Sequence, residues 1–235
     1  MKQYKEAYKK AFPYTIPVLT GYLFIGIAFG VMFAEKGYSF LWAAFMSLLV
    51  YAGSAQYLAV NFFIPGISIL HVVFLILTVN IRHVFYGISL LDRFDGMGKK
   101  RWYMIFSLTD ETYSLLCTTK IPDNVDEDHF LFAIASLNQS YWVIGSIIGA
   151  VAGSVLPFNA EGIDFAMTAL FVVIFVEQWM DEKNRIPEMI GILAAFICLQ
   201  IFGASNFVLP SMLVIVMILF VSKSKLSKEV GVSCQ

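Results

Sequence analysis

An arginine, a histidine and an asparagine interrupt an otherwise apolar stretch, LTVNIRHVFYGISL at residues 77–90. Insertion scales place an arginine at the centre of a membrane helix at about 2.5–3.5 kcal/mol unfavourable, so Arg82 needs a partner or water. Its planar guanidinium suits an anionic group such as a carboxylate. It could instead reach the membrane surface, because Leu91 is only about 13 Å further along a helix. Asn80 lies beside it, and His83 could carry protons or be a hydrogen-bonded structural residue.

Two adjacent carboxylates, Asp110 and Glu111, stand near the centre of the next predicted helix, within SLTDETYSLL at residues 107–116. Carboxylates are costly in lipid, so at least one should pair with a cation, bind a substrate ammonium group or take up a proton. Neighbours in a helix point about 100° apart, so the two cannot face one partner together. The alternative is a structural ion pair with Arg82 that holds helices together.

Small and amide residues interrupt a third apolar stretch at AGSAQ, residues 52–56. Gly53 and Ser54 offer unwound backbone and Gln56 offers an amide, and such features bind a small zwitterion or an ion in interrupted membrane helices. The alternative is a kink in which glycine permits close helix packing.

Later apolar segments also carry amides, and we expect polar lining from the second half of the chain at Asn138, Gln139 and Gln178. Substrate binding is predicted for Gly53, Ser54, Gln56, Asn80, Arg82 and Tyr86. Proton coupling or ammonium binding is predicted for His83, Asp110 and Glu111.

The elements that must position these residues are transmembrane helices. Of the 235 residues, 59% are hydrophobic and only 14% are charged, whereas a soluble domain carries about 25% charged residues. This excludes a soluble or disordered protein, leaves no room for a soluble catalytic domain and implies no nucleic-acid partner. We expect an all-α integral membrane protein in the lipid bilayer, with one transmembrane domain over residues 1–235. Its apolar segments lie at 13–34, 39–64, 67–91, 102–119, 129–156, 163–180, 186–203 and 207–222.

Lysines and arginines in short loops predict the orientation, because they stay on the cytoplasmic side. They gather at the N-terminus, in the loop 92–101 (the basic loop) and after residue 222, so both termini are predicted to be cytoplasmic. The loop 121–128 (the acidic loop) is then expected outside. If all eight apolar segments crossed the membrane, the basic loop would follow three crossings and would lie outside, which contradicts its lysines and arginines. The segments around AGSAQ and at 163–180 are therefore each expected to be broken or re-entrant, leaving about six full crossings.

The regions around these two interruptions resemble each other. Each contains a small-residue helix that also favours close helix packing; the small residues are Gly26, Gly30, Gly145 and Gly149. On the predicted topology the first helix runs outward and its counterpart runs inward. This predicts two inverted-topology halves, about residues 11–119 and 129–222, an arrangement that in transporters places the site at interrupted helices.

Several motifs together resemble the AzlC family of branched-chain amino acid permeases. They are PYTIPVLTGYLFIGIAFGVMF, AAFMSLLVYAGSAQYLAV, LTVNIRHVFYGISL and SLTDETYSL, and the resemblance covers about residues 11–200. The resemblance implies a multi-pass inner-membrane exporter of branched-chain and related amino acids. It also implies a small hydrophobic AzlD-like partner that completes the transporter.

We predict a secondary active transporter that exports leucine, isoleucine, valine and analogues such as methionine, driven by the proton gradient. Arg82 would receive the substrate carboxylate, and Asp110 or Glu111 would take the ammonium group or the coupled proton. A passive channel for small solutes is the alternative function. An enzyme is not expected, because neither HExxH nor GxSxG occurs in the sequence, and no cofactor or metal site is predicted.

Overall fold

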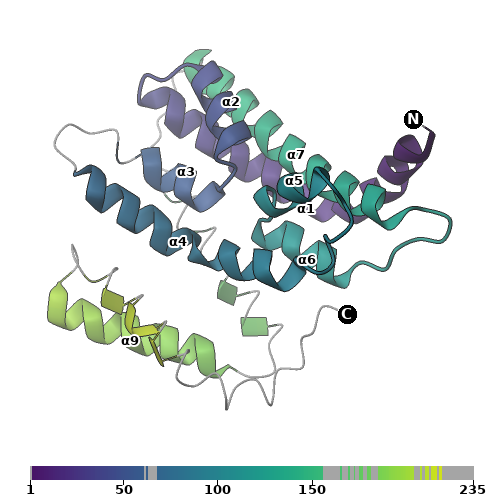
Figure 1. Cartoon of the computed structure of the whole chain (residues 1–235). Coiled ribbons are helices and arrows are strands. Elements are labelled where there is room, and N and C mark those ends of the chain that lie inside the picture. Colours follow the sequence, from purple (N-terminus) through teal and green to yellow (C-terminus); the bar gives the residue numbers. More distant parts are fainter. Residues whose placement is uncertain are drawn as a thin grey trace.

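The structure, a computed structural model, describes residues 2–60, 68–155 and 185–203, with short pieces at residue 62, between 165 and 180 and between 207 and 218. The regular elements in these ranges are α-helices, as the apolar segments predict (Figure 1). Helix α9 (Ile186–Phe202) follows one of those segments closely. Some predicted features lie outside the described residues: Gln178, much of the segment 163–180, half of the segment 207–222 and the basic C-terminal end.

The described helices form a bundle, and its three longest helices are α1 (Lys2–Glu35), α4 (Ile69–Leu90) and α7 (Glu127–Val155). By length and composition, α1 and α7 are able to span a membrane. The 22 residues of α4 rise about 33 Å, close to the ~30 Å thickness of a bilayer's hydrocarbon core. All three helices coincide with predicted segments, although α1 begins earlier than predicted.

Helices α1 and α7 lie side by side and run in the same direction (Figure 1). Near their N-terminal ends, Tyr8 Oη and Ser136 Oγ are 2.6 Å apart. Further along both helices, a Cβ added at Gly149 would come within 2.0 Å of the Ile27 carbonyl oxygen. The predicted close packing at the glycines is confirmed. The predicted inverted repeat is wrong for these helices, because it required them to run in opposite directions.

Between α1 and α4 the chain forms a helical hairpin, called here the first hairpin. Its arms are α2 (Phe40–Leu49) and α3 (Gly53–Val60), separated by a break at residues 50–52. Tyr51 in the break has a φ of 43°, a left-handed conformation that is uncommon for residues with a side chain and is typical of a tight turn. The predicted interruption near AGSAQ is confirmed, and the helix restarts at Gly53.

Both arms of the first hairpin pack on the C-terminal parts of α1 and α7. In α2, Ser47 Oγ donates to Ser146 Oγ at 2.8 Å. In α3, Tyr57 Oη donates to the Ile25 carbonyl at 2.6 Å. The first hairpin therefore begins at the end of the bundle where α1 ends, and α3 leads the chain back toward that same end.

A second hairpin follows α4, in a segment for which one continuous helix was predicted over 102–119. The structure shows two short helices, α5 (Lys100–Phe106) and α6 (Asp110–Thr118). Thr109 caps α6 by accepting a hydrogen bond from the Thr112 backbone N–H at 3.2 Å. The two carboxylates occupy the first turn of α6, where the positive end of the helix dipole favours them. The prediction of one unbroken helix is therefore wrong.

The second hairpin also turns back, and it brings the acidic loop to the end of the bundle that carries the basic loop and the N-terminus. Arg93 Nε in the basic loop lies 2.9 Å from Glu127 Oε1. Lys10 Nζ donates to the Asp123 carbonyl in the acidic loop at 2.8 Å. The two loops were predicted to lie on opposite sides, but the structure places them at one end of the bundle, because the segment between them turns back.

Helix α4 runs opposite to α1, since Leu90 and Phe94 near its C-terminal end share one apolar core with Ala7 and Ala11 near the start of α1. Helix α1 with the first hairpin and α4 with the second hairpin thus have opposite orientations (Figure 1). The described part of the chain thus contains an inverted pair within the predicted first half.

Candidate functional site

The tips of the two hairpins meet in the middle of the bundle, where the Tyr51 and Phe106 rings are 6.3 Å apart. A cavity of about 40 Å³ lies beside these tips, and this volume accommodates water rather than an amino acid. Six predicted site residues line it: Gly53, Ser54, Arg82, His83, Asp110 and Glu111. Five residues that were not predicted complete the wall: Tyr22, Ile25, Tyr51, Thr109 and Trp142.

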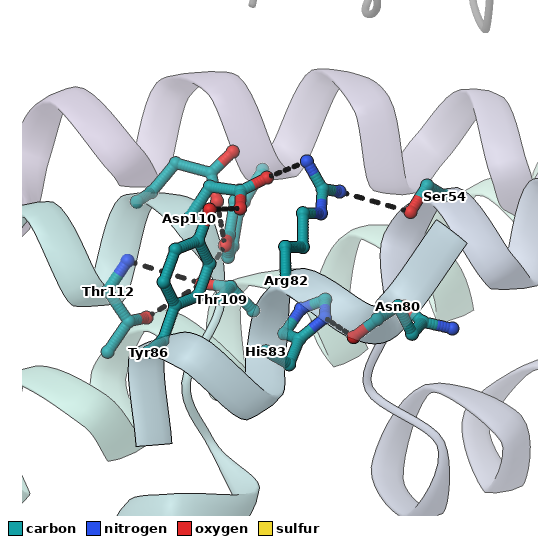
Figure 2. A network of polar contacts seen from close by, with 10 residues as sticks. Ser54, Asn80, Arg82, His83, Tyr86, Thr109, Asp110 and Thr112 are labelled. Carbon is teal, nitrogen blue, oxygen red and sulfur yellow. Dashed lines mark hydrogen bonds and ion pairs between the residues drawn. The ribbon is translucent and has the colours of Figure 1, made fainter. Parts of the chain in front are cut away.

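Arg82 in α4 joins the two hairpin tips (Figure 2). Its Nη1 lies 2.7 Å from Asp110 Oδ2 at the start of α6, and its Nη2 donates to Ser54 Oγ in the first turn of α3 at 3.2 Å. Both charged side chains are largely shielded, with 30% and 23% of their surfaces exposed. Arg82 Nε is buried without a hydrogen-bond partner among the described residues, so the guanidinium retains an unused donor.

Tyr86, one turn after Arg82 on α4, holds Asp110 from the other side. Its Oη donates to Asp110 Oδ1 at 2.7 Å (Figure 2). The carboxylate therefore has both oxygens engaged, one by a cation and one by a phenol.

Glu111 has different surroundings from its neighbour Asp110. Tyr22 Oη lies 2.6 Å from Glu111 Oε2 and 2.6 Å from Thr109 Oγ1. Glu111 makes no ion pair within the described residues. A phenol has one proton, so Tyr22 donates either to Glu111 or to Thr109 but not to both at once.

His83 lines the cavity, whereas the Asn80 side chain forms its hydrogen bond within α4. His83 Nδ1 lies 3.1 Å from the Asn80 carbonyl. Because a carbonyl only accepts, Nδ1 donates this hydrogen bond, and in the neutral ring Nε2 is then an acceptor. Asn80 Nδ2 donates to the Ile76 carbonyl at 3.0 Å.

Gln56 lies behind the cavity and is fully buried. Its Oε1 accepts a hydrogen bond from Trp142 Nε1 at 2.9 Å, and its Nε2 donates to Ser47 Oγ at 3.0 Å. The amide predicted to bind substrate thus contacts a wall residue of the cavity instead of lining the cavity.

Two amides of α7 connect that helix to the hairpins. Asn138 Nδ2 donates to Thr112 Oγ1 in α6 at 3.0 Å. Gln139 accepts from Tyr103 Oη in α5 at 2.7 Å and donates to the Leu48 carbonyl in α2 at 3.1 Å. Neither lines the cavity, and Gln178 lies outside the described residues.

The residues that sequence reasoning missed are mostly aromatic. Tyr22 and Trp142 are buried. Tyr22 lies in an apolar stretch and Trp142 closely follows the polar residues NQS, but aromatic side chains are frequent in this sequence and do not by themselves mark a site. Thr109 had a signal, because a threonine before two acidic residues is a typical helix N-cap.

The described residues contain no group of three or more His, Cys, Asp or Glu side chains that could hold a metal ion. The chemical groups that the cavity does offer are one guanidinium, two carboxylates, an imidazole, hydroxyls and aromatic surface. These groups can bind a small zwitterion with an apolar side chain and can transfer protons.

Residues 17–156 match the family model described as AzlC protein. This range extends from α1 to the end of α7 and includes both hairpins and the entire cavity wall. The predicted resemblance to this family is confirmed.

The chain is similar to several curated proteins along most of its length. It is 45% identical to the Branched-chain amino acid transport protein AzlC of Bacillus subtilis, with 96% of this chain and 89% of that protein covered. It is 40% identical to an Uncharacterized membrane protein of Haemophilus influenzae (95% and 92% covered) and 27% identical to the Inner membrane protein YgaZ of Escherichia coli (72% of each). No solved structure matches the chain.

Proposed function

This chain belongs to the AzlC family of membrane proteins, and from that membership we propose that it is a secondary transporter for branched-chain amino acids. Leucine, isoleucine and valine are the proposed substrates, with methionine as an analogue. We propose export across the inner membrane, proton coupling, cytoplasmic termini and a small hydrophobic AzlD-like partner. The similarity to the branched-chain amino acid transport protein of B. subtilis supports the substrate class.

The observation that carries the proposal is the Arg82–Asp110 ion pair between the two hairpin tips. An amino acid carries a carboxylate and an ammonium group. Its carboxylate can replace Asp110 as the partner of Arg82, and its ammonium group can replace Arg82 as the partner of Asp110. Its carboxylate would bind the Arg82 guanidinium, whose planar donors suit that group, and its ammonium group would bind Asp110. The ion pair would then be exchanged for two intermolecular ones, and neither charge would be left uncompensated.

The small cavity volume supports a transport cycle with moving hairpins. At about 40 Å³ the cavity must expand before an amino acid can enter. The first hairpin extends from one end of the bundle and the second hairpin from the other end. Movement of either hairpin would therefore open a path from that end to the cavity. This geometry favours alternating access over a continuously open pore.

Glu111 is the proposed carrier of the coupled proton. Asp110 is compensated by Arg82, whereas Glu111 makes no ion pair within the described residues and faces the Tyr22 hydroxyl. A carboxylate without a cation in a membrane interior is readily neutralised by a proton.

The test is efflux of labelled leucine from proteoliposomes that contain the purified chain, with a proton gradient imposed. We expect Arg82→Ala and Asp110→Asn to lower the efflux about 10- to 100-fold, the effect of losing a charged hydrogen bond. Arg101→Ala is the matched control, because Arg101 pairs with Asp95 at the exposed surface. Undiminished efflux in both site variants would exclude the ion pair from the mechanism. A wild-type efflux rate that is the same with and without the proton gradient would indicate a channel.

A further inference from the structure

We infer that Trp142 is the wall of the cavity that selects the substrate side chain, and that Gln56 is the residue that positions it. This inference rests on the proposed amino-acid transport and adds the basis of its selectivity. The reasons are the place of the indole in the cavity and the way its orientation is held.

The indole of Trp142 faces the tip of the first hairpin. A Cβ added at Gly53 would lie 3.0 Å from Trp142 Cη2 and 3.3 Å from Cζ2, so the six-membered ring lies against the Gly53 backbone. Trp142 and Ile25 supply apolar surface to the same cavity into which Arg82 and Asp110 project. A zwitterion held at the ion pair would therefore place its side chain against this apolar surface.

A closed ring of buried hydrogen bonds holds the indole in this orientation. Trp142 Nε1 donates to Gln56 Oε1 at 2.9 Å, and Gln56 Nε2 donates to Ser47 Oγ at 3.0 Å. Ser47 Oγ donates to Ser146 Oγ, and Ser146 Oγ donates to the Trp142 carbonyl, each at 2.8 Å. Both arms of the first hairpin contribute, through Ser47 in α2 and Gln56 in α3.

Aromatic neighbours hold the ring from its other sides. Tyr22 meets Trp142 edge to face with centroids 5.5 Å apart, and Phe29 stacks on it at 6.3 Å. Trp142 is only 4% exposed, so the indole cannot swing away without breaking these contacts. A rigid wall of this kind limits the length and width of the side chain that fits beside it.

The inference predicts a change of selectivity and not only of rate. In reconstituted vesicles we expect Trp142→Phe to lower the ratio of leucine to phenylalanine kcat/KM about tenfold, the scale on which pocket shape discriminates apolar side chains. The change should appear mainly in KM, rising for leucine and falling for phenylalanine. Gln56→Met, which keeps the volume but removes the acceptor for Trp142 Nε1, should shift the ratio in the same direction by a smaller factor.

Two variants serve as matched controls: Trp102→Phe, at a tryptophan that is 77% exposed on α5, and Gln200→Met, at an exposed glutamine of α9. Both should leave the ratio unchanged. If leucine and phenylalanine transport fall together in Trp142→Phe and in Gln56→Met, with the ratio unchanged, the inference is overturned while the proposed function stands.

A binding measurement tests the same residue without transport. In a variant whose other three tryptophans (Trp42, Trp102 and Trp179) are phenylalanine, leucine titration should change the fluorescence of Trp142. Absence of a change in a protein that transports leucine would overturn the inference. Wild-type vesicles that move none of the amino acids would instead overturn the proposed function.

Discussion

Adjacent carboxylates in the cavity have different partners, and this difference separates their proposed roles. Asp110 is 2.7 Å from the guanidinium of Arg82 and accepts a hydrogen bond from Tyr86. Glu111, one residue later, faces Tyr22 on α1. The residues point in different directions because successive side chains of a helix are about 100° apart. Asp110 is therefore the carboxylate proposed to bind substrate, and Glu111 is the one proposed to carry the proton.

Glu111→Gln should uncouple transport from the proton gradient. Glutamine has nearly the shape of the protonated acid but cannot release a proton, so we expect leucine–leucine exchange to persist. Gradient-driven efflux of leucine should fall by at least about tenfold. Both modes are measured in the same vesicles, with Glu6→Gln at an exposed position as control. Unchanged gradient-driven efflux would exclude Glu111 as the proton carrier.

Arg82→Lys should weaken leucine transport although it keeps the charge. Arg82 uses two nitrogens to reach Asp110 and Ser54 on different hairpins, whereas lysine has one compact ammonium group and no planar fork. We expect KM for leucine to rise about tenfold, the cost of one lost charged hydrogen bond. A KM equal to that of the wild type would show that the positive charge alone suffices.

At the scale of elements, glycines set the distance between α1 and α7. A Cβ at Gly149 would lie 2.0 Å from the Ile27 carbonyl oxygen, and one at Gly30 would lie 2.2 Å from the Ser146 carbonyl oxygen. These neighbours are backbone atoms, which cannot move without shifting a whole helix. The contact matters to the site because α7 also holds the hairpins through Asn138 and Gln139.

Gly149→Ala should therefore destabilise the protein by about 1–3 kcal/mol, the usual cost of overpacking. Thermal unfolding in detergent measures the change. Gly21→Ala is the control on α1, because a Cβ there would meet nothing within 4 Å. If both variants unfold at the same temperature as the wild type, the two helices do not pack at this distance.

The start of α7 is expected to lose stability in acid. Asp126 Oδ1 accepts the His129 backbone N–H at 3.0 Å and is also bonded by the His129 ring. These hydrogen bonds, the ring's first, hold the pKa of Asp126 below its usual value. A carboxylate of this kind stabilises the fold fully above its unfolded-state pKa of about 4, and the contribution is lost as the pH falls through the lower folded value.

Acidification should therefore affect the wild type more than Asp126→Asn. Thermal unfolding in detergent at a series of pH values from 7 to 3 provides the comparison, with Asp123→Asn at an exposed loop position as control. The wild type and the control should lose stability by the same amount and Asp126→Asn by less. An equal loss in all three proteins would contradict the role of this cap.

At the scale of the whole molecule, the two hairpins determine which loops lie at the same end of the bundle. The basic and acidic loops are joined by the Arg93–Glu127 ion pair, and the N-terminal helix reaches the acidic loop through Lys10. The connection between α1 and α2 lies at the opposite end of the bundle (Figure 1). This arrangement replaces the predicted topology with one that labelling can test.

Single cysteines should report this arrangement in a background without the three native ones. We expect Asp95→Cys and Asp123→Cys to react with a membrane-impermeant thiol reagent from the same side of the membrane. Lys36→Cys, which follows α1, should react only from the other side. Labelling of the two loops from opposite sides would show that the second hairpin crosses the membrane.

The sequence by itself determined the helical membrane class and the charged groups that line the cavity. Apolar composition excludes a soluble fold, and Arg82, Asp110 and Glu111 stand out because a charge in an apolar segment requires compensation. The interruption at AGSAQ was also readable, since glycine and polar residues at mid-segment disfavour a continuous helix.

Only the tertiary structure decided which segments turn back and what each polar side chain contacts. Hydropathy is summed along a segment, so the two short helices of the second hairpin have the same apolar signal as one crossing helix. Gln56 was predicted to meet substrate, but long-range packing of α3 on α7 places its amide against Trp142. Contacts between residues 86 positions apart depend on how helices pack, and that information is absent from local residue patterns.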